Sequence, residues 1–139
     1  MKLATILTIG IMVCVATAAG GQEAGNRPQV PIIIKHWPEG EAPCAYGVVH
    51  NLDPKGDGFL AVKAGPGVHY ERIDKLSNGK QIIICGDKGA WHGIIYTKTR
   101  QGDAMRYCNV EENRRKDFPY TGPCRSGWAH QRWIKQISN

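Results

Sequence analysis

The chain has 139 residues, 42% of them hydrophobic, and a formal net charge of +6. This length is enough for one domain with a modest core and excludes an assembly of several large domains. A basic surface favours anionic partners, which are nucleic acids inside a cell and wall polymers, lipid head groups or acidic proteins outside it. The charge alone therefore does not select the partner.

The first 18 residues have the pattern of a secretory signal peptide. Lys2 provides a minimal positive start, residues 3–15 form an apolar run, and Ala16-Thr17-Ala18 supplies small residues for cleavage. The run is shorter than the roughly 20 apolar residues that span a bilayer. We therefore expect a periplasmic or secreted protein with no stable membrane span after signal cleavage and no nucleic-acid partner.

Four cysteines remain beyond this segment, at positions 44, 85, 108 and 124. An even number in an exported chain favours two disulfides, and the Cys-x-x-Cys spacing of zinc ribbons is missing. Of the three possible connectivities we favour Cys108–Cys124, because these residues flank one polar loop. Cys44–Cys85 would then tie the N-terminal part to a central strand.

The N-terminal half predicts short strands separated by turns. Residues 19–43 form an extension in which the β-branched stretch 30–34 contains a proline and suits an edge strand. Residues 46–50 and 59–62 are the next expected strands, and the segment between them is dense in turn residues. A Gly-Pro-Gly turn at 65–67 follows the second of these strands.

The C-terminal half continues this pattern. Asn78-Gly79 predicts a type I′ hairpin turn after a weakly alternating stretch at 70–76. Three consecutive isoleucines, Ile82–Ile84, indicate a strand buried on both faces, and residues 90–97 form the next strand. Residues 98–123 are polar and lack periodicity. We therefore predict an all-β fold, a small barrel of short antiparallel strands over 44–139, with 98–123 as a long inserted loop.

The chain resembles the bacterial SH3-like (SH3b) domain family in its exported single-domain form. The resemblance is carried by residues 59–70 (FLAVKAGPGVHY), residues 73–84 (IDKLSNGKQIII), Trp91 and the closing segment 127–134 (GWAHQRWI). It implies an SH3-like barrel with a binding role. Lys63 stands where the family usually has arginine, and the N-terminal extension and the 98–123 insertion lie outside the family pattern.

Motifs for metal binding or catalysis are weak in this sequence. Asp53-x-Lys55-x-Asp57-Gly58 has part of a calcium-loop pattern, but Lys55 and Ala64 stand where ligands are needed, so we expect an ordinary turn. The five histidines include no pair at helical spacing. Disulfide bonding would remove a cysteine nucleophile, and the neighbours Glu111 and Glu112 are typical of a solvated loop. We expect no metal, no cofactor and no enzyme activity.

Aromatic and basic side chains are the better candidates for a ligand site. Exposed aromatic rings provide platforms for peptides or sugars, and arginines donate paired hydrogen bonds to carboxylates. Tyr70 follows the first turn, where SH3-like barrels line their ligand groove. Core packing is the alternative role for Trp91, and a plain solvated loop is the alternative for residues 113–117. The predicted ligand-binding residues are Tyr70, Trp91, Tyr96, Arg114, Arg115 and Arg125.

Two functions fit these observations. The first is an exported, non-enzymatic binding module that contacts cell-wall peptidoglycan or its peptides. The second is a periplasmic partner of an acidic envelope protein, such as an inhibitor or immunity protein of a wall-degrading enzyme or toxin. A single small domain with a basic surface is compatible with both.

Overall fold

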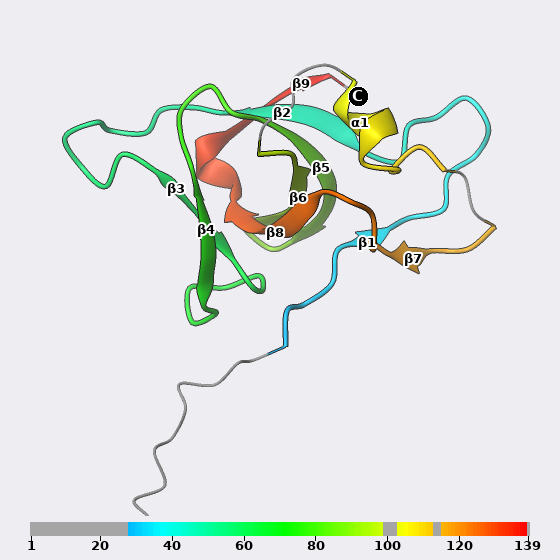
Figure 1. Cartoon of the computed structure of the whole chain (residues 1–139), viewed down its shortest axis with the longest axis horizontal. Helices are drawn as coiled ribbons and strands as arrows, with labels where there is room; N and C mark the ends of the chain where they lie inside the picture. The colour runs from blue at the N-terminus through cyan, green and yellow to red at the C-terminus, as the bar shows by residue number, and fades with distance from the viewer. Residues whose placement is uncertain (1–27, 99–102, 113–114, 139) are drawn as a thin grey trace, which may run out of the picture.

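Seven short strands form one antiparallel sheet that curls on itself (Figure 1). The computed structural model describes residues 28–98, 103–112 and 115–138. Its elements are β1 (Ile33–Ile34), β2 (Ala45–Val49), β3 (Leu60–Lys63), β4 (Arg72–Leu76), β5 (Gln81–Lys88), β6 (Trp91–Tyr96), α1 (Ala104–Tyr107), β7 (Phe118–Pro119), β8 (Arg125–His130), the 3₁₀ turn η1 (Gln131–Trp133) and β9 (Ile134–Ser138). The sheet order is β4-β3-β8-β6-β5-β2-β9, while β1 pairs only with β7. The predicted all-β fold of short antiparallel strands is confirmed. The predicted signal sequence lies outside the described residues.

The curled sheet buries an apolar core on each of its faces. The core enclosed by the curl, here the inner core, consists of Val49, Leu52, Leu60, Val62, Leu76, Ile82, Ile84, Ile94, Tyr96, Ala129 and Ile134. The core on the other face, the outer core, consists of Ile32, Ile34, Trp37, Cys44, Ile83, Cys85, Ile95, Met105, Cys108, Val110 and Trp128. Successive strand residues point to opposite faces, so Ile83 joins the outer core and its two neighbours the inner one. The predicted burial of Ile82–Ile84 on both faces is confirmed.

Two segments without clear periodicity in the sequence cover the outer face of the sheet. Residues 32–37 of the N-terminal extension and 105–110 of the insertion supply buried side chains to the outer core, and β1 of the extension pairs with β7, which lies further along the insertion. In Figure 1 these elements and α1 lie together at one side of the curl. Trp128 Nε1 of β8 donates a hydrogen bond to the carbonyl oxygen of Val30 at 2.9 Å. The N-terminal extension and the insertion therefore act as one covering layer.

Both disulfides belong to the outer core. Cys44 is bonded to Cys85, and Cys108 to Cys124, with Cα–Cα distances of 4.5 and 5.3 Å. These are the two pairings that the sequence favours. The first joins the start of β2 to β5, and the second holds the end of α1 against the segment that leads into β8.

The prediction of a hairpin at Asn78-Gly79 is wrong. β4 pairs with β3, whereas β5 pairs with β2 and β6, so the turn joins strands that are not neighbours. Gly79 has a positive φ of 82°, but Asn78 does not share it, as a type I′ turn would require. The Asn78 side chain instead bonds the backbone of Leu52, accepting from its N–H at 3.0 Å and donating to its oxygen at 3.1 Å. Long-range pairing therefore overrides the local turn signal.

The Asp53 segment is an ordinary turn, as predicted. The N–H of Lys55 donates to Asp53 Oδ1 at 2.8 Å, and the N–H of Gly56 donates to the Asp53 carbonyl oxygen at 3.0 Å. Such an Asx turn uses the aspartate to close its own loop. Among the described residues no helix is long and apolar enough to cross a membrane.

Candidate binding pocket at one end of the inner core

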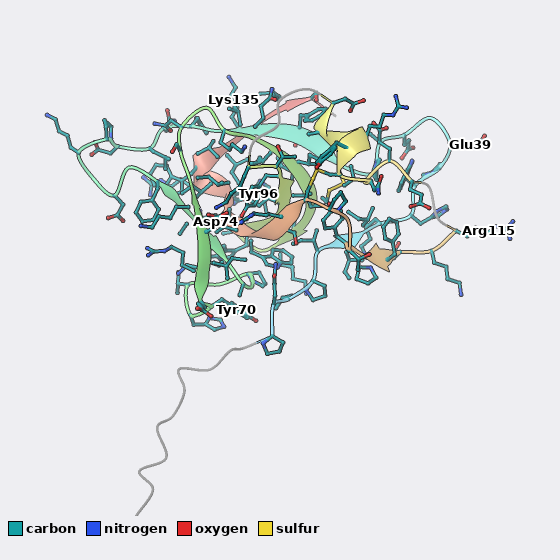
Figure 2. All side chains as sticks on the ribbon, viewed as in Figure 1. Glu39, Tyr70, Asp74, Tyr96, Arg115 and Lys135 are labelled. Carbon is teal, nitrogen blue, oxygen red and sulfur yellow. A yellow bond between two sulfur atoms is a disulfide. The ribbon has the colours of Figure 1, made fainter. Side chains whose placement is uncertain are left out.

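Asp74 of β4 points toward the end of the inner core, because it faces Val62 and lies two residues before Leu76, which are both members of that core. In the β3–β4 register Val62 faces Asp74 and Lys63 faces Arg72, so Ile73 is the extra residue. A bulge of this kind breaks the alternation of side chains along the strand. The Asp74 carboxylate, whose side chain is 12% exposed, accepts a hydrogen bond from the Tyr96 hydroxyl at 2.8 Å. Figure 2 shows these two side chains meeting in the middle of the molecule.

Two cations share this single carboxylate. Arg125 lies opposite Tyr96 in the β6–β8 register, and its Nη1 lies 3.3 Å from Asp74 Oδ2. Lys98 Nζ lies 3.6 Å from Asp74 Oδ1. The cationic side chains are 54% and 52% exposed, so both reach solvent while the carboxylate does not. Among the described residues no second carboxylate pairs with either cation, so one positive charge of this cluster is left over.

The pKa values in the cluster follow from burial and hydrogen bonding. Burial raises the pKa of Asp74, but the Lys75 amide, the Tyr96 hydroxyl and the two cations outweigh it, so its pKa lies below the ordinary value. Burial, followed by the hydrogen bond to Asp74, raises the pKa of Tyr96 well above its ordinary value. At neutral pH the cluster thus consists of a carboxylate, a neutral phenol and two cations.

Beside the cluster lies a cavity of about 220 Å³. Lys98 and Arg125 form its basic side, and Tyr107 and Pro123 contribute apolar surface. Tyr107 lines the cavity and is 44% exposed. A cation beside an aromatic surface is suited to a small group that carries a negative charge.

Covalent and hydrogen-bonded contacts fix the wall of the cavity that contains Cys124. Its disulfide partner Cys108 is fully buried, and the N–H of Cys124 donates to the Tyr120 hydroxyl at 3.0 Å. Gly122 is required in this loop, because a Cβ there would lie 2.5 Å from both the Cys108 oxygen and the Tyr120 hydroxyl. On the other side, Asp103 caps α1 by accepting from the N–H of Arg106. A fixed wall reduces the entropy lost when a ligand binds.

The structure brings together two of the six predicted ligand residues, Tyr96 and Arg125. Arg125 lines the cavity with its exposed guanidinium. The expectation that Tyr96 offers an exposed ring needs correction, because this residue is only 2% exposed and its ring belongs to the inner core. Its hydroxyl, which orients Asp74, is the part that matters at this site.

The other predicted ligand residues lie elsewhere. Tyr70 is half-buried, packs over Gly65 and stacks on His69 with ring centroids 4.3 Å apart. Trp91 begins β6, at the end opposite Tyr96, and packs against the outer core. Arg115 is exposed and lies far from Tyr70 in the view of Figure 2. Arg114 lies outside the described residues.

Sequence reasoning missed Asp74, Lys98 and Tyr107. Asp74 was hidden because residues 70–76 alternate only weakly, and its partners lie on segments distant in sequence. Lys98 and Tyr107 flank a segment without periodicity, so nothing local places them together. The basic residues near Arg125 were the one feature of the sequence that pointed to this site.

The comparisons with known proteins give no family for this chain. No protein-family model, no curated protein and no solved structure matches it. The resemblance to bacterial SH3-like domains stays a prediction from the sequence.

Proposed function

We propose that this protein is an exported, non-enzymatic binding module that holds a free carboxylate of a peptidoglycan peptide in the pocket between Lys98 and Arg125. The observation that supports this most is the charge imbalance, in which two exposed cations share one buried carboxylate. Guanidinium and ammonium groups form charge-assisted hydrogen bonds with carboxylates, so a second carboxylate is the natural complement.

The size of the cavity supports the end of a chain as the ligand. Its volume of about 220 Å³ is smaller than the roughly 300–1,000 Å³ of sites that enclose a whole small molecule. A terminal residue with a small side chain fits this space, with its carboxylate toward the cations and its methyl group toward Tyr107 and Pro123. Wall peptides carry such ends.

The state of Asp74 supports binding rather than catalysis. Its oxygens accept from the Lys75 amide and the Tyr96 hydroxyl and face two cations, and its pKa is lowered. A general base works best when its pKa lies near the working pH, so this carboxylate is better suited to holding the cations in place. The two disulfides are compatible with an oxidising compartment outside the cytosol.

Sedimentation with purified peptidoglycan at low salt tests the proposal. We expect the wild-type protein to pellet with the polymer and the double variant Lys98→Gln/Arg125→Gln to stay in solution. The control is Lys135→Gln on β9, which removes one exposed cation away from the pocket and should pellet like wild type (Figure 2). Failure of the wild-type protein to pellet would contradict the proposal.

A competition experiment on the wild-type protein avoids any effect of the substitutions on folding. Free N-acetyl-alanyl-alanine should release the protein from the polymer, because its terminal carboxylate occupies the pocket. The corresponding amide lacks the charge and should not release it. Equal release by both compounds would show that the carboxylate is not recognised.

A further inference from the structure

We propose that a second surface, the outer face of β3 and β4, docks an acidic segment of a partner protein. This cationic face consists of Phe59, Lys63, Arg72 and Lys75. Leu60 and Val62 of β3 point into the inner core, so Lys63 lies on the opposite face of the strand. Lys63 stands directly opposite Arg72 in the register, which places both cations on this face.

The bulge at Ile73 gathers the cations around one aromatic ring. Residues three positions apart in a regular strand point to opposite faces, yet Arg72 and Lys75 both contact Phe59. Arg72 Cζ lies 5.2 Å and Lys75 Nζ 4.5 Å from the centroid of the ring. The bulge thus brings Arg72 to the face where Lys75 already lies, while Asp74 points inward like Leu76.

The charge of this face is not balanced within the described part of the chain. No salt bridge there joins Lys63, Arg72 or Lys75 to a carboxylate. Like charges directly opposite one another on a sheet are destabilising, and Lys63 and Arg72 form such a pair. Carboxylates of a partner would relieve this repulsion, so the arrangement complements an acidic surface.

The cation–π contacts with Phe59 prepare two of the cations for binding. A side chain that already rests on an aromatic ring loses less rotamer freedom when it forms an ion pair. Val68, at the tip of the β3–β4 connection, is 80% exposed, and Ile73 is 40% exposed. The exposed side chains of Ile73, next to Arg72 in β4, and of Val68, in the loop that joins the two strands, favour a protein partner over a polyanion that offers only charge.

The edge of the sheet indicates how this partner docks and which partner is disfavoured. β4 is an edge strand, but the N–H of Lys75 donates to Asp74 Oδ1 at 2.8 Å and is therefore not free for strand addition. The partner thus contacts side chains rather than extending the sheet. Pairing β4 with β4 of a second copy in the register that sets Arg72 opposite Lys75 would place cations against cations, so this mode of self-association is disfavoured.

The test uses a peptide of alternating glutamate and alanine, about 12 residues long so that it follows a strand pair, amidated at its C-terminus and labelled with an uncharged dye. Fluorescence anisotropy should show binding that weakens as salt is added. Arg72→Gln/Lys75→Gln should weaken binding about tenfold, roughly threefold for each exposed ion pair. Lys135→Gln and the glutamine–alanine peptide are the matched controls.

Two further measurements keep the outcome decisive. The variant Arg72→Gln loses both the repulsion with Lys63 and the contact with Phe59, and these losses offset each other. Its thermal unfolding should therefore match that of wild type, so that weaker binding cannot be blamed on misfolding. Lys98→Gln/Arg125→Gln should leave binding of the acidic peptide unchanged, which separates this face from the carboxylate pocket. Unchanged binding by Arg72→Gln/Lys75→Gln, or binding only to vesicles of phosphatidylcholine and phosphatidylglycerol, would overturn the proposal.

Discussion

The inner and outer cores bury similar sets of apolar side chains, but they are held together in different ways. Strands enclose the inner core, and none of its members is a cysteine. In their described residues, the segments that cover the outer core form two strands, β1 and β7, of two residues each, and both disulfides lie in this core. Cys108–Cys124 thus cross-links the covering layer, whereas Cys44–Cys85 joins the residue before β2 to β5, next to the ladder pair Ala45 and Ile84.

Long-range backbone contacts complete the covering layer of the outer core. The N–H of Val30 donates to the Ala64 oxygen and the N–H of Tyr120 to the Ile32 oxygen, each at 2.7 Å. The N–H of His36 donates to Asp117 Oδ1, also at 2.7 Å. Such isolated bonds lack the cooperativity of a ladder, so we expect this layer to open at a lower free energy than the sheet. The wall of the carboxylate pocket is part of the layer.

The largest expected difference comes from two adjacent isoleucines that point to opposite faces. Ile94 and Ile95 of β6 are both fully buried, the first in the inner core and the second in the outer core. Ile94→Ala should cost about 4 kcal/mol of unfolding free energy, within the range for deleting a buried isoleucine. Ile95→Ala should cost less, because the covering layer can relax into the cavity.

Urea denaturation of the two alanine variants measures this difference. An equal or larger cost for Ile95→Ala would show that the covering layer is as rigid as the sheet.

Removing the Cys108–Cys124 disulfide should be next in size. It closes a loop with a sequence separation of 16, for which the chain-entropy model gives about 3 kcal/mol. In Cys108→Ser/Cys124→Ser we expect hydrogen exchange to accelerate across 103–112 and 115–124 while β5 and β6 stay protected. Loss of protection throughout the sheet would contradict the separation of the two cores.

A smaller effect is expected from Trp128→Phe. Phenylalanine keeps an aromatic ring in the outer core but loses the Nε1 hydrogen bond to Val30. We expect a loss of about 1 kcal/mol, a usual net value for one hydrogen bond, and faster exchange around Val30. Unchanged exchange there would show that this bond does not hold the N-terminal segment.

The smallest expected effect is the pH dependence of stability that the Asp74 carboxylate contributes. The pKa of Asp74 is lower in the folded protein than in the unfolded chain. Its contribution to the free energy of unfolding is therefore complete above the ordinary pKa of 3.8 and disappears as the pH falls through the lowered pKa of the folded protein. Between about pH 6 and about pH 3 the wild-type melting temperature should therefore fall further than that of Asp74→Asn. Equal falls would show that the Asp74 contacts do not contribute.

The sequence predicts those parts of the fold that depend on local pattern. Consecutive isoleucines at 82–84 marked a central strand, and cysteines flanking a polar loop marked one disulfide. The hairpin at Asn78-Gly79 failed because a turn signal does not say which strands become neighbours. The bulge at Ile73 was equally hidden, and it decides that Arg72 lies on the same face as Lys75. The candidate site was therefore only partly predictable, through Arg125.

The most direct test of the central claim is a ¹H–¹⁵N NMR titration of the wild-type protein with N-acetyl-alanyl-alanine. We predict saturable shifts of the backbone amides of Thr97, Lys98, Tyr107, Cys124 and Arg125, which line the cavity, and none with the amide of the same dipeptide. Shifts that do not saturate, or that are centred on another surface, would contradict a carboxylate-binding pocket at this end of the inner core.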